Sequence, residues 1–173
     1  MTVTTQYDEQ FKDAGAKWLP EWDWLYFRAQ GYAESLLQPD AVSSEGAKGL
    51  MQFEDPTWED VKFRLRFPFS ASPFDPQYAI PAGVYFDALM RNGWAAPRSE
   101  DDRRALSFAS YNAGFGNILK AQKEAKDAAD WQSISRQLWR ITGADNAKQT
   151  IDYVNRIEQY YQQFKGEENA TGQ

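Results

Sequence analysis

Helix start and stop signals recur along the whole chain and leave little room for any other kind of element. Asp-Pro pairs at 55–56 and 75–76 each predict a helix, with aspartate as the N-cap and proline in the first turn. A Ser-x-x-Asp sequence at 99–102 resembles a capping box and predicts a third helix start. No convincing alternating strand pattern appears, and the run 63–69 indicates a short extended piece or a loop. The pattern therefore predicts a mainly α fold.

Apolar spacing and stop signals together define the expected elements. Helices are expected at roughly 22–37, 55 onward, 75–91 with a kink at Pro81, 99–112, 117–127, 131–140 and 146–164. The segment 38–49, which contains proline, serine and glycine but few apolar residues, predicts a long ordered loop. A chain of 173 residues is too short for two domains of typical size. We expect one domain over residues 1–165 and a disordered polar tail over 166–173.

The chain contains no histidine and no cysteine, which excludes several kinds of catalysis. Ser-His-Asp and Cys-His sites each need an imidazole base. Zinc sites lose both of their favoured ligands, and disulfides cannot form. Proton chemistry is left to carboxylates, lysine and tyrosine, and we expect neither a metal nor a cofactor.

Charge and hydropathy exclude two kinds of partner. A net charge of −6 argues against binding to nucleic acid, which requires a basic face. No stretch approaches the length of a membrane span, and the N-terminus lacks the basic and apolar regions of a secretory signal. The expectation is that the chain stays in the cytoplasm of the cell that makes it until something releases it. Aromatic residues make up 16% of the chain, and most of them are expected in the core, although sugar clefts also use aromatic faces.

Four segments combine polar and small residues at expected helix ends and in the loop. In chain order they are Glu34–Ser43, Gly46–Gln52, Ala109–Gly114 and Gln149–Val154. Glu34 lies on a strongly apolar stretch, where desolvation raises the pKa of a carboxyl group and suits it to general acid catalysis. Taken singly, each segment also has a structural explanation: Glu34 as an exposed helix-end residue, the glycines as an ordinary loop, Asn112 as a cap and Tyr153 as a core residue.

Taken together, the segments resemble the soluble-type lytic transglycosylases, the goose-lysozyme-like branch of the lysozyme superfamily. That family has Glu-Ser near a helix end, then Gly-Ala-x-Gly-Leu-Met-Gln, Ala-x-Tyr-Asn-Ala-Gly and Glu-Thr-x-x-Tyr-Val, and the same order appears here between residues 34 and 154. The resemblance implies a lysozyme-like single domain with a catalytic glutamate at a helix end and a substrate cleft. It also implies a monomer that acts on the glycan strands of peptidoglycan.

The same resemblance implies roles for individual residues. Glu34 would protonate the oxygen of the MurNAc-β-1,4-GlcNAc bond and then take the proton of the C6 hydroxyl, which yields a 1,6-anhydromuramyl end. Ser35 would orient Glu34 or the substrate. The other implied substrate-binding residues are Met51, Gln52, Glu54, Tyr111, Asn112, Gln149 and Tyr153.

Two positions depart from the family pattern. Gln149 stands where glutamate is common, so a role that needs negative charge there is in doubt, although an amide still hydrogen-bonds a sugar hydroxyl. Glu54 stands where an apolar residue is common and adds a second carboxylate. A goose-type muramidase therefore stays open as an alternative, with Glu54, Asp55 or Asp40 positioning a water, and so does a non-catalytic glycan-binding or virion protein.

A narrower likeness concerns the segment 109–122. Its run Ala-Ser-Tyr-Asn-Ala-Gly-Phe-Gly-Asn, continued by Lys-Ala-Gln at 120–122, is most similar to endolysins of Mu-like tailed phages. This implies a role in host cell lysis. The enzyme would wait in the host cytoplasm and reach the periplasmic peptidoglycan through holin-made lesions.

Overall fold

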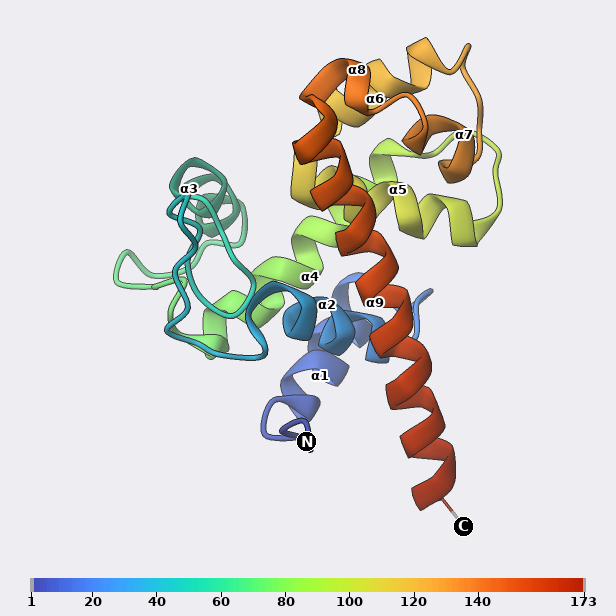
Figure 1. Ribbon diagram of the computed structural model, residues 1–173. Coiled ribbons are helices and arrows are strands. Elements are labelled where there is room, and N and C mark those ends of the chain that lie inside the picture. The colour runs from blue at the N-terminus through green and yellow to red at the C-terminus, as the bar shows by residue number, and fades with distance from the viewer. Residues whose placement is uncertain (1, 173) are drawn as a thin grey trace. The chain divides into compact units, whose positions relative to one another are not determined.

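The computed structural model describes residues 2–172, which form helices joined by loops (Figure 1). The helices are α1 (Asp8–Trp18), α2 (Leu25–Ser35), α3 (Asp55–Arg64), α4 (Pro76–Gly93), α5 (Glu100–Ala113), α6 (Phe115–Glu124), α7 (Trp131–Ser135), α8 (Trp139–Thr142) and α9 (Ala144–Thr171). Within the described residues, β-type pairing is confined to isolated bridges, which join Lys48 to Val42 and to Phe53. The expectation of a mainly α fold is therefore confirmed.

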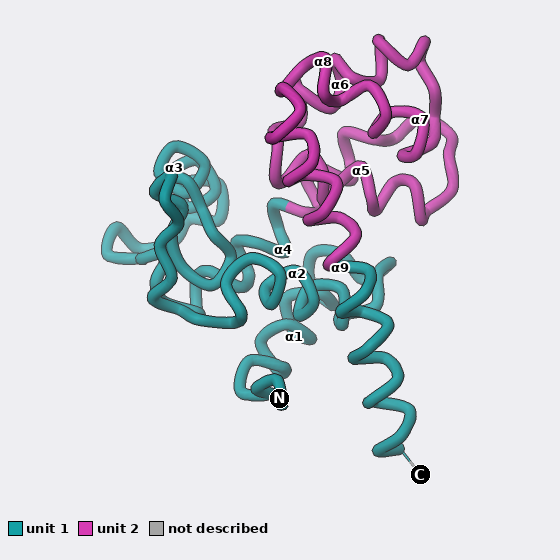
Figure 2. The backbone as a smooth tube through the Cα atoms, in the orientation of Figure 1, with its two compact units in different colours: residues 1–86, 157–173 teal, residues 87–156 magenta. Residues whose placement is uncertain are grey.

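The chain forms two compact units, which Figure 2 shows in different colours. Unit 1 comprises the described residues 2–86 and 157–172, and unit 2 comprises residues 87–156. Helices α4 and α9 contribute residues to both. The core of unit 1 includes Phe11, Leu19, Phe27, Leu50, Val61, Ile80 and Phe164, and that of unit 2 includes Trp94, Leu106, Ile118, Ile134 and Leu138.

The sequence signals for helix starts place α3, α4 and α5 correctly, with one change at a cap. Ser99 accepts a hydrogen bond from the backbone N–H of Asp102 at 3.0 Å, as the capping box predicts. The N-cap of α3, however, is Glu54 and not Asp55. Asp55 instead lies in the first turn, where the helix dipole favours an acidic side chain, and pairs with Lys48 at 2.8 Å.

Other element boundaries differ from the expectations. The segment 131–140 divides into α7 and α8, and the run 63–69 is the end of α3 followed by a loop. Helix α1 was not expected, because its N-cap residue makes no side-chain cap and its buried face includes the small residues Ala14 and Gly15.

The prediction of a disordered tail was wrong for residues 166–171, which continue α9 to Thr171. Side chains one turn apart support this polar extension. Lys165 pairs with Glu168 at 3.0 Å, and Gln163 bonds Glu167 at 3.1 Å. The last residue of the expected tail, 173, lies outside the described residues.

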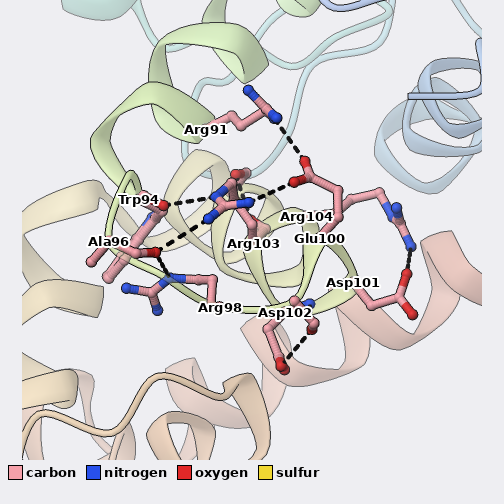
Figure 3. A network of polar contacts seen from close by, with 11 residues as sticks. Arg91, Trp94, Ala96, Arg98, Glu100, Asp101, Asp102, Arg103 and Arg104 are labelled. Carbon is pink, nitrogen blue, oxygen red and sulfur yellow. Dashed lines mark hydrogen bonds and ion pairs between the residues drawn. The ribbon is translucent and has the colours of Figure 1, made fainter. Parts of the chain in front are cut away.

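Glu100 and Arg103 organise the connection between α4 and α5 in unit 2 (Figure 3). The two carboxylate oxygens of Glu100 bind Arg91 Nε at 2.7 Å and Arg103 Nη1 at 2.6 Å. Arg103 also donates to the carbonyl oxygens of Trp94 at 2.9 Å and Ala96 at 3.2 Å. Two carbonyls of this connection are thereby paired, and the start of α5 is attached to the end of α4.

Arg28 has a comparable role in unit 1, where it joins the N-terminal segment to α2. Its guanidinium donates to the carbonyl oxygens of Val3 at 3.3 Å and Thr4 at 3.0 Å, and its Nε lies 3.0 Å from Asp8. It also lies over the ring of Phe164, 4.2 Å from the centroid. Arg28 is only 5% exposed, so these contacts replace almost all of its hydration.

The Arg28→Met variant is expected to lose about 3 kcal/mol of unfolding free energy, because it leaves Asp8 without its cation and two carbonyl groups without donors. Burial raises the pKa of Asp8, and Arg28 opposes that rise. The deficit should therefore shrink as the pH falls through this pKa, since the neutral carboxyl no longer needs the cation. Urea unfolding at several pH values measures both effects. Lys148→Met, which removes an exposed pair with Asp152, is the control, and an equal loss in the two variants would contradict this role.

Candidate functional site

Glu34 lies in the last turn of α2 and is half-buried. Apolar residues such as Leu25, Phe27 and Ala29 bury the body of this helix in unit 1, which fixes the position of its end. The partial negative charge at a helix C-terminus favours the neutral form of a carboxyl group placed there. A glutamate in this position is thus a candidate general acid.

The end of α2 has an uncommon backbone. Leu36 and Leu37 are both left-handed, with φ of 56° and 59°, which non-glycine residues seldom adopt. The N–H of Leu36 donates to the carbonyl of Tyr32 at 2.9 Å, and Leu37 is 4% exposed. Burial of Leu37 and helix capping offset the strain, so the chain turns sharply directly after Glu34 and Ser35.

Ser35 joins the end of α2 to the loop at 46–52, which contains Gly46 and Gly49. Its hydroxyl lies 2.8 Å from the carbonyl oxygen of Leu50 and accepts a hydrogen bond from the N–H of Gln38 at 3.2 Å. The structure thus brings the first two of the four sequence segments together within unit 1. The Ser35 hydroxyl thereby ties the helix end that carries Glu34 to this loop.

Gly49 and Gln52 shape the loop that Ser35 contacts. Gly49 has a φ of +80°, and a Cβ atom there would lie 1.8 Å from the carbonyl oxygen of Pro73. Its N–H donates to the carbonyl of Ala41 at 2.8 Å. The side-chain nitrogen of Gln52 donates to the carbonyls of Gly49 at 2.9 Å and Ala41 at 3.3 Å. With that nitrogen committed to the loop, the side-chain oxygen of Gln52 is the atom that can meet a ligand.

Met51 and Glu54 have different environments. Met51 is 0% exposed and packs against α4, where a Cβ atom on Gly83 would lie 2.6 Å from its Cε. Met51, which the resemblance implies as a substrate-binding residue, thus has its side chain in the core of unit 1 and supports the loop from beneath. Glu54 is exposed at the N-terminus of α3, which leaves its carboxylate accessible to solvent.

The other expected site residues lie in unit 2. Tyr111 is half-buried and Asn112 is exposed, both in the last turn of α5. Gln149 is exposed on α9, whereas Tyr153 on the same helix is only 2% exposed. Tyr153 therefore has a predominantly internal position.

Thr150 stands in the fourth sequence segment, but the sequence analysis gave it no role. It is 2% exposed, and its hydroxyl lies 2.8 Å from the side-chain oxygen of Asn112 and 3.1 Å from the carbonyl of Asn146. The hydroxyl thereby joins the third and fourth sequence segments within unit 2. The only hint in the sequence was a threonine within a predicted helix, since its hydroxyl needs a hydrogen-bond partner wherever it is buried.

The Thr150→Val variant keeps the shape of the side chain and removes its hydroxyl. We expect it to lose about 1 kcal/mol of unfolding free energy, since Asn112 loses its partner. Thermal or urea unfolding measures the change. The control is Thr171→Val, whose hydroxyl bonds only carbonyls of its own helix in an exposed position, and an equal effect of both substitutions would contradict the assignment.

Within residues 2–172, no three or more acidic side chains gather closely enough to hold a metal ion. Over the same residues, no helix combines the length and the apolar character that crossing a membrane requires.

Comparisons with known proteins relate this chain to proteins that are named lytic transglycosylases. The family model described as "Transglycosylase SLT domain" matches residues 11–134. The membrane-bound lytic murein transglycosylase F of Ectopseudomonas mendocina is 27% identical over 170 residues, which cover 90% of this chain and 33% of that protein. Its namesake from Desulfosudis oleivorans is 32% identical over 157 residues, which cover 83% of this chain and 33% of that protein. The chain thus spans about a third of the length of these relatives.

A solved structure shares the fold. The 70 kDa soluble lytic transglycosylase of Escherichia coli superposes with a TM-score of 0.74 and 23% sequence identity, over 95% of this chain and 25% of that one. The likeness confirms the mainly helical, lysozyme-like fold that the sequence predicts.

Proposed function

Because this chain belongs to the transglycosylase SLT family, we propose that it cleaves the β-1,4 bond between N-acetylmuramic acid and N-acetylglucosamine in peptidoglycan and leaves 1,6-anhydromuramyl ends. Glu34 is the single acid–base residue in this proposal. The substrate is the glycan strand, the chain acts as a monomer, and no metal or cofactor takes part.

The observation that carries the proposal is the position of Glu34 in a chain of this family. It is half-buried at the C-terminal end of α2, where the helix dipole favours the neutral acid. The bond from Ser35 to Leu50 and the turn at Leu36 keep this helix end in one orientation. A general acid needs such a fixed position, since proton transfer falls off steeply with misplacement.

The reaction then has two steps, and its atoms balance without water. In the first, the Glu34 carboxyl donates its proton to the glycosidic oxygen while the C1–O bond breaks, so the N-acetylglucosamine side leaves as an alcohol and the muramyl ring gains oxocarbenium character. In the second, the Glu34 carboxylate takes the proton of the C6 hydroxyl, and O6 bonds to C1. The residue ends protonated, ready for the next turnover.

The remaining assignments follow the structure within each unit. In unit 1, Ser35 positions Glu34, and the side-chain oxygen of Gln52 accepts a hydrogen bond from a sugar hydroxyl. In unit 2, Tyr111, Asn112 and Gln149 present polar atoms to the glycan, and the buried Tyr153 supports them.

Digestion of purified sacculi tests whether the chain acts as an enzyme. The proposal expects turbidity to fall and soluble muropeptides to appear. A protein that only binds glycan would sediment with the sacculi and release nothing, and this outcome would refute the proposal.

The exposed carboxylate of Glu54 favours one second candidate, a goose-type muramidase in which a water attacks C1. A water positioned by Glu54 would leave a reducing end in place of the anhydro end. Digestion in ¹⁸O-labelled water separates the two reactions: a hydrolase incorporates the label into its muramyl product, and a lytic transglycosylase does not.

We propose host cell lysis as the biological role, with the chain acting as an endolysin that holin-made lesions release from the host cytoplasm to the peptidoglycan. The run at 109–122, with its likeness to endolysins of Mu-like phages, supports this role. Expression in a Gram-negative cell tests it. Lysis should follow only when a holin is produced with the chain, and lysis that never depends on a holin would contradict this route.

A further inference from the structure

The loop that follows α3 exposes apolar and basic side chains that the proposed function does not use. The segment 62–69 reads Lys-Phe-Arg-Leu-Arg-Phe-Pro-Phe, with three cations and no carboxylate in a chain whose net charge is −6. Phe63 is 83% exposed and Phe69 is 96% exposed. The loop extends away from the helices of unit 1 in Figure 1. Large apolar side chains gathered on a surface in this way mark a contact site.

The segment 62–69 comprises the last turn of α3 and the ordered loop that follows it. The N–H of Phe67 donates to the carbonyl of Lys62 at 3.0 Å, and the N–H of Arg66 donates to the carbonyl of Phe63 at 3.1 Å. The Nζ atom of Lys62 lies 4.9 Å from the centroid of the Phe69 ring. The loop therefore folds Phe69 back beside Lys62 in the last turn of α3, while Phe63 is exposed on that same helical turn.

A cavity of about 460 Å³ beside this segment extends the basic surface. Its apolar lining residues are Ala14, Trp18, Leu65, Phe67 and Pro81. Lys17 of α1 lines it together with Arg64 and Arg66, against the carboxylate of Asp13. Arg64 also pairs with Asp60 at 2.9 Å, but half-exposed surface pairs of this kind are weak and can be exchanged for another anion.

We propose that segment 62–69 docks this chain on the surface of an anionic phospholipid bilayer. Phe63 and Phe69 enter the interfacial region, while Lys17, Arg64 and Arg66 meet lipid phosphates. Two rings cover far less than the roughly 800 Å² that each partner of a stable protein complex buries. A bilayer needs only a few inserting side chains, and its repeated negative charge complements a basic patch on an otherwise acidic chain.

Flotation of the purified chain with phosphatidylcholine vesicles, with and without phosphatidylglycerol, tests the proposal. We expect binding only to the phosphatidylglycerol vesicles at low salt, and its loss at about 1 M salt, where charges are screened within about 3 Å. Phe63→Ser combined with Phe69→Ser should weaken binding at least tenfold. Lys17→Gln combined with Arg66→Gln should weaken it by a similar factor, since each cation near an anionic surface contributes about fivefold.

Trp139→Ala is the matched control. Trp139 is also an exposed aromatic residue beside an arginine, at 51% exposure and 4.8 Å from Arg140, but it lies outside this segment. Its removal should leave vesicle binding unchanged, and circular dichroism should show that all variants fold. The proposal is overturned if the parent chain ignores phosphatidylglycerol vesicles, if Trp139→Ala weakens binding as much as the phenylalanine variant, or if that variant loses binding to sacculi and keeps binding to vesicles.

Discussion

The Glu34→Gln variant is expected to fold like the parent chain and to lose lytic activity by about a hundredfold to ten-thousandfold, the range that general acid–base catalysis supplies. Glutamine has almost the same shape as glutamate, but its amide can neither protonate the glycosidic oxygen nor take the proton of the C6 hydroxyl. Both proposed steps therefore fail in one substitution. The rate of muropeptide release from sacculi measures the loss.

Glu21→Gln is the control for this variant, because Glu21 is exposed in the same unit and lies outside the proposed site. It should release muropeptides at the parent rate. Thermal unfolding of both variants shows whether the fold is retained. A Glu34→Gln protein that stays within tenfold of the parent activity would remove Glu34 from the mechanism.

Gly49→Ala is expected to cause the largest loss of stability, about 4 kcal/mol or more, together with a loss of activity. A Cβ atom at this position would lie 1.8 Å from the carbonyl oxygen of Pro73, and the φ of +80° already disfavours any side chain. Because the Pro73 oxygen belongs to the backbone, it cannot move aside as a side chain would, and the loop around Gly49 would have to shift. Gln52 would lose the Gly49 carbonyl that holds its amide.

Gly46→Ala separates the steric contact with Pro73 from the cost of a side chain at positive φ. Gly46 belongs to the same loop and has a similar φ of +88°, but no atom lies within 4 Å of the position of its Cβ. The backbone penalty alone should cost about 1 kcal/mol and leave activity near the parent level. Urea unfolding compares the two variants. Equal losses would show that the contact with Pro73 does not matter.

Local signals predicted much of the fold. The Asp-Pro pairs and the capping box at 99–102 start helices through contacts with neighbouring backbone groups. The sequence therefore suffices to place the starts of α3, α4 and α5. Helix α1 lacks such a cap and was missed. The end of α9 was also missed, because residues 166–171 have no apolar stripe and are supported by polar pairs such as Lys165 with Glu168 and Gln163 with Glu167.

The candidate site likewise has features that the sequence predicts and features that depend on contacts distant in the sequence. The order of its motifs located Glu34 and Ser35 at a helix end, where the structure places them. Whether a side chain is buried, however, depends on the residues that pack against it. Met51 belongs to the core because Gly83, which has no side chain, leaves room for it. The partnership of Thr150 with Asn112 joins positions 38 residues apart and could not be predicted from spacing.

Mass spectrometry of the muropeptides released from Gram-negative sacculi tests the central claim most directly. The proposed mechanism closes O6 on C1, so each new muramyl end should be an anhydro end, one water lighter than a reducing end. Products that carry reducing muramyl ends would contradict the account and establish hydrolysis in its place.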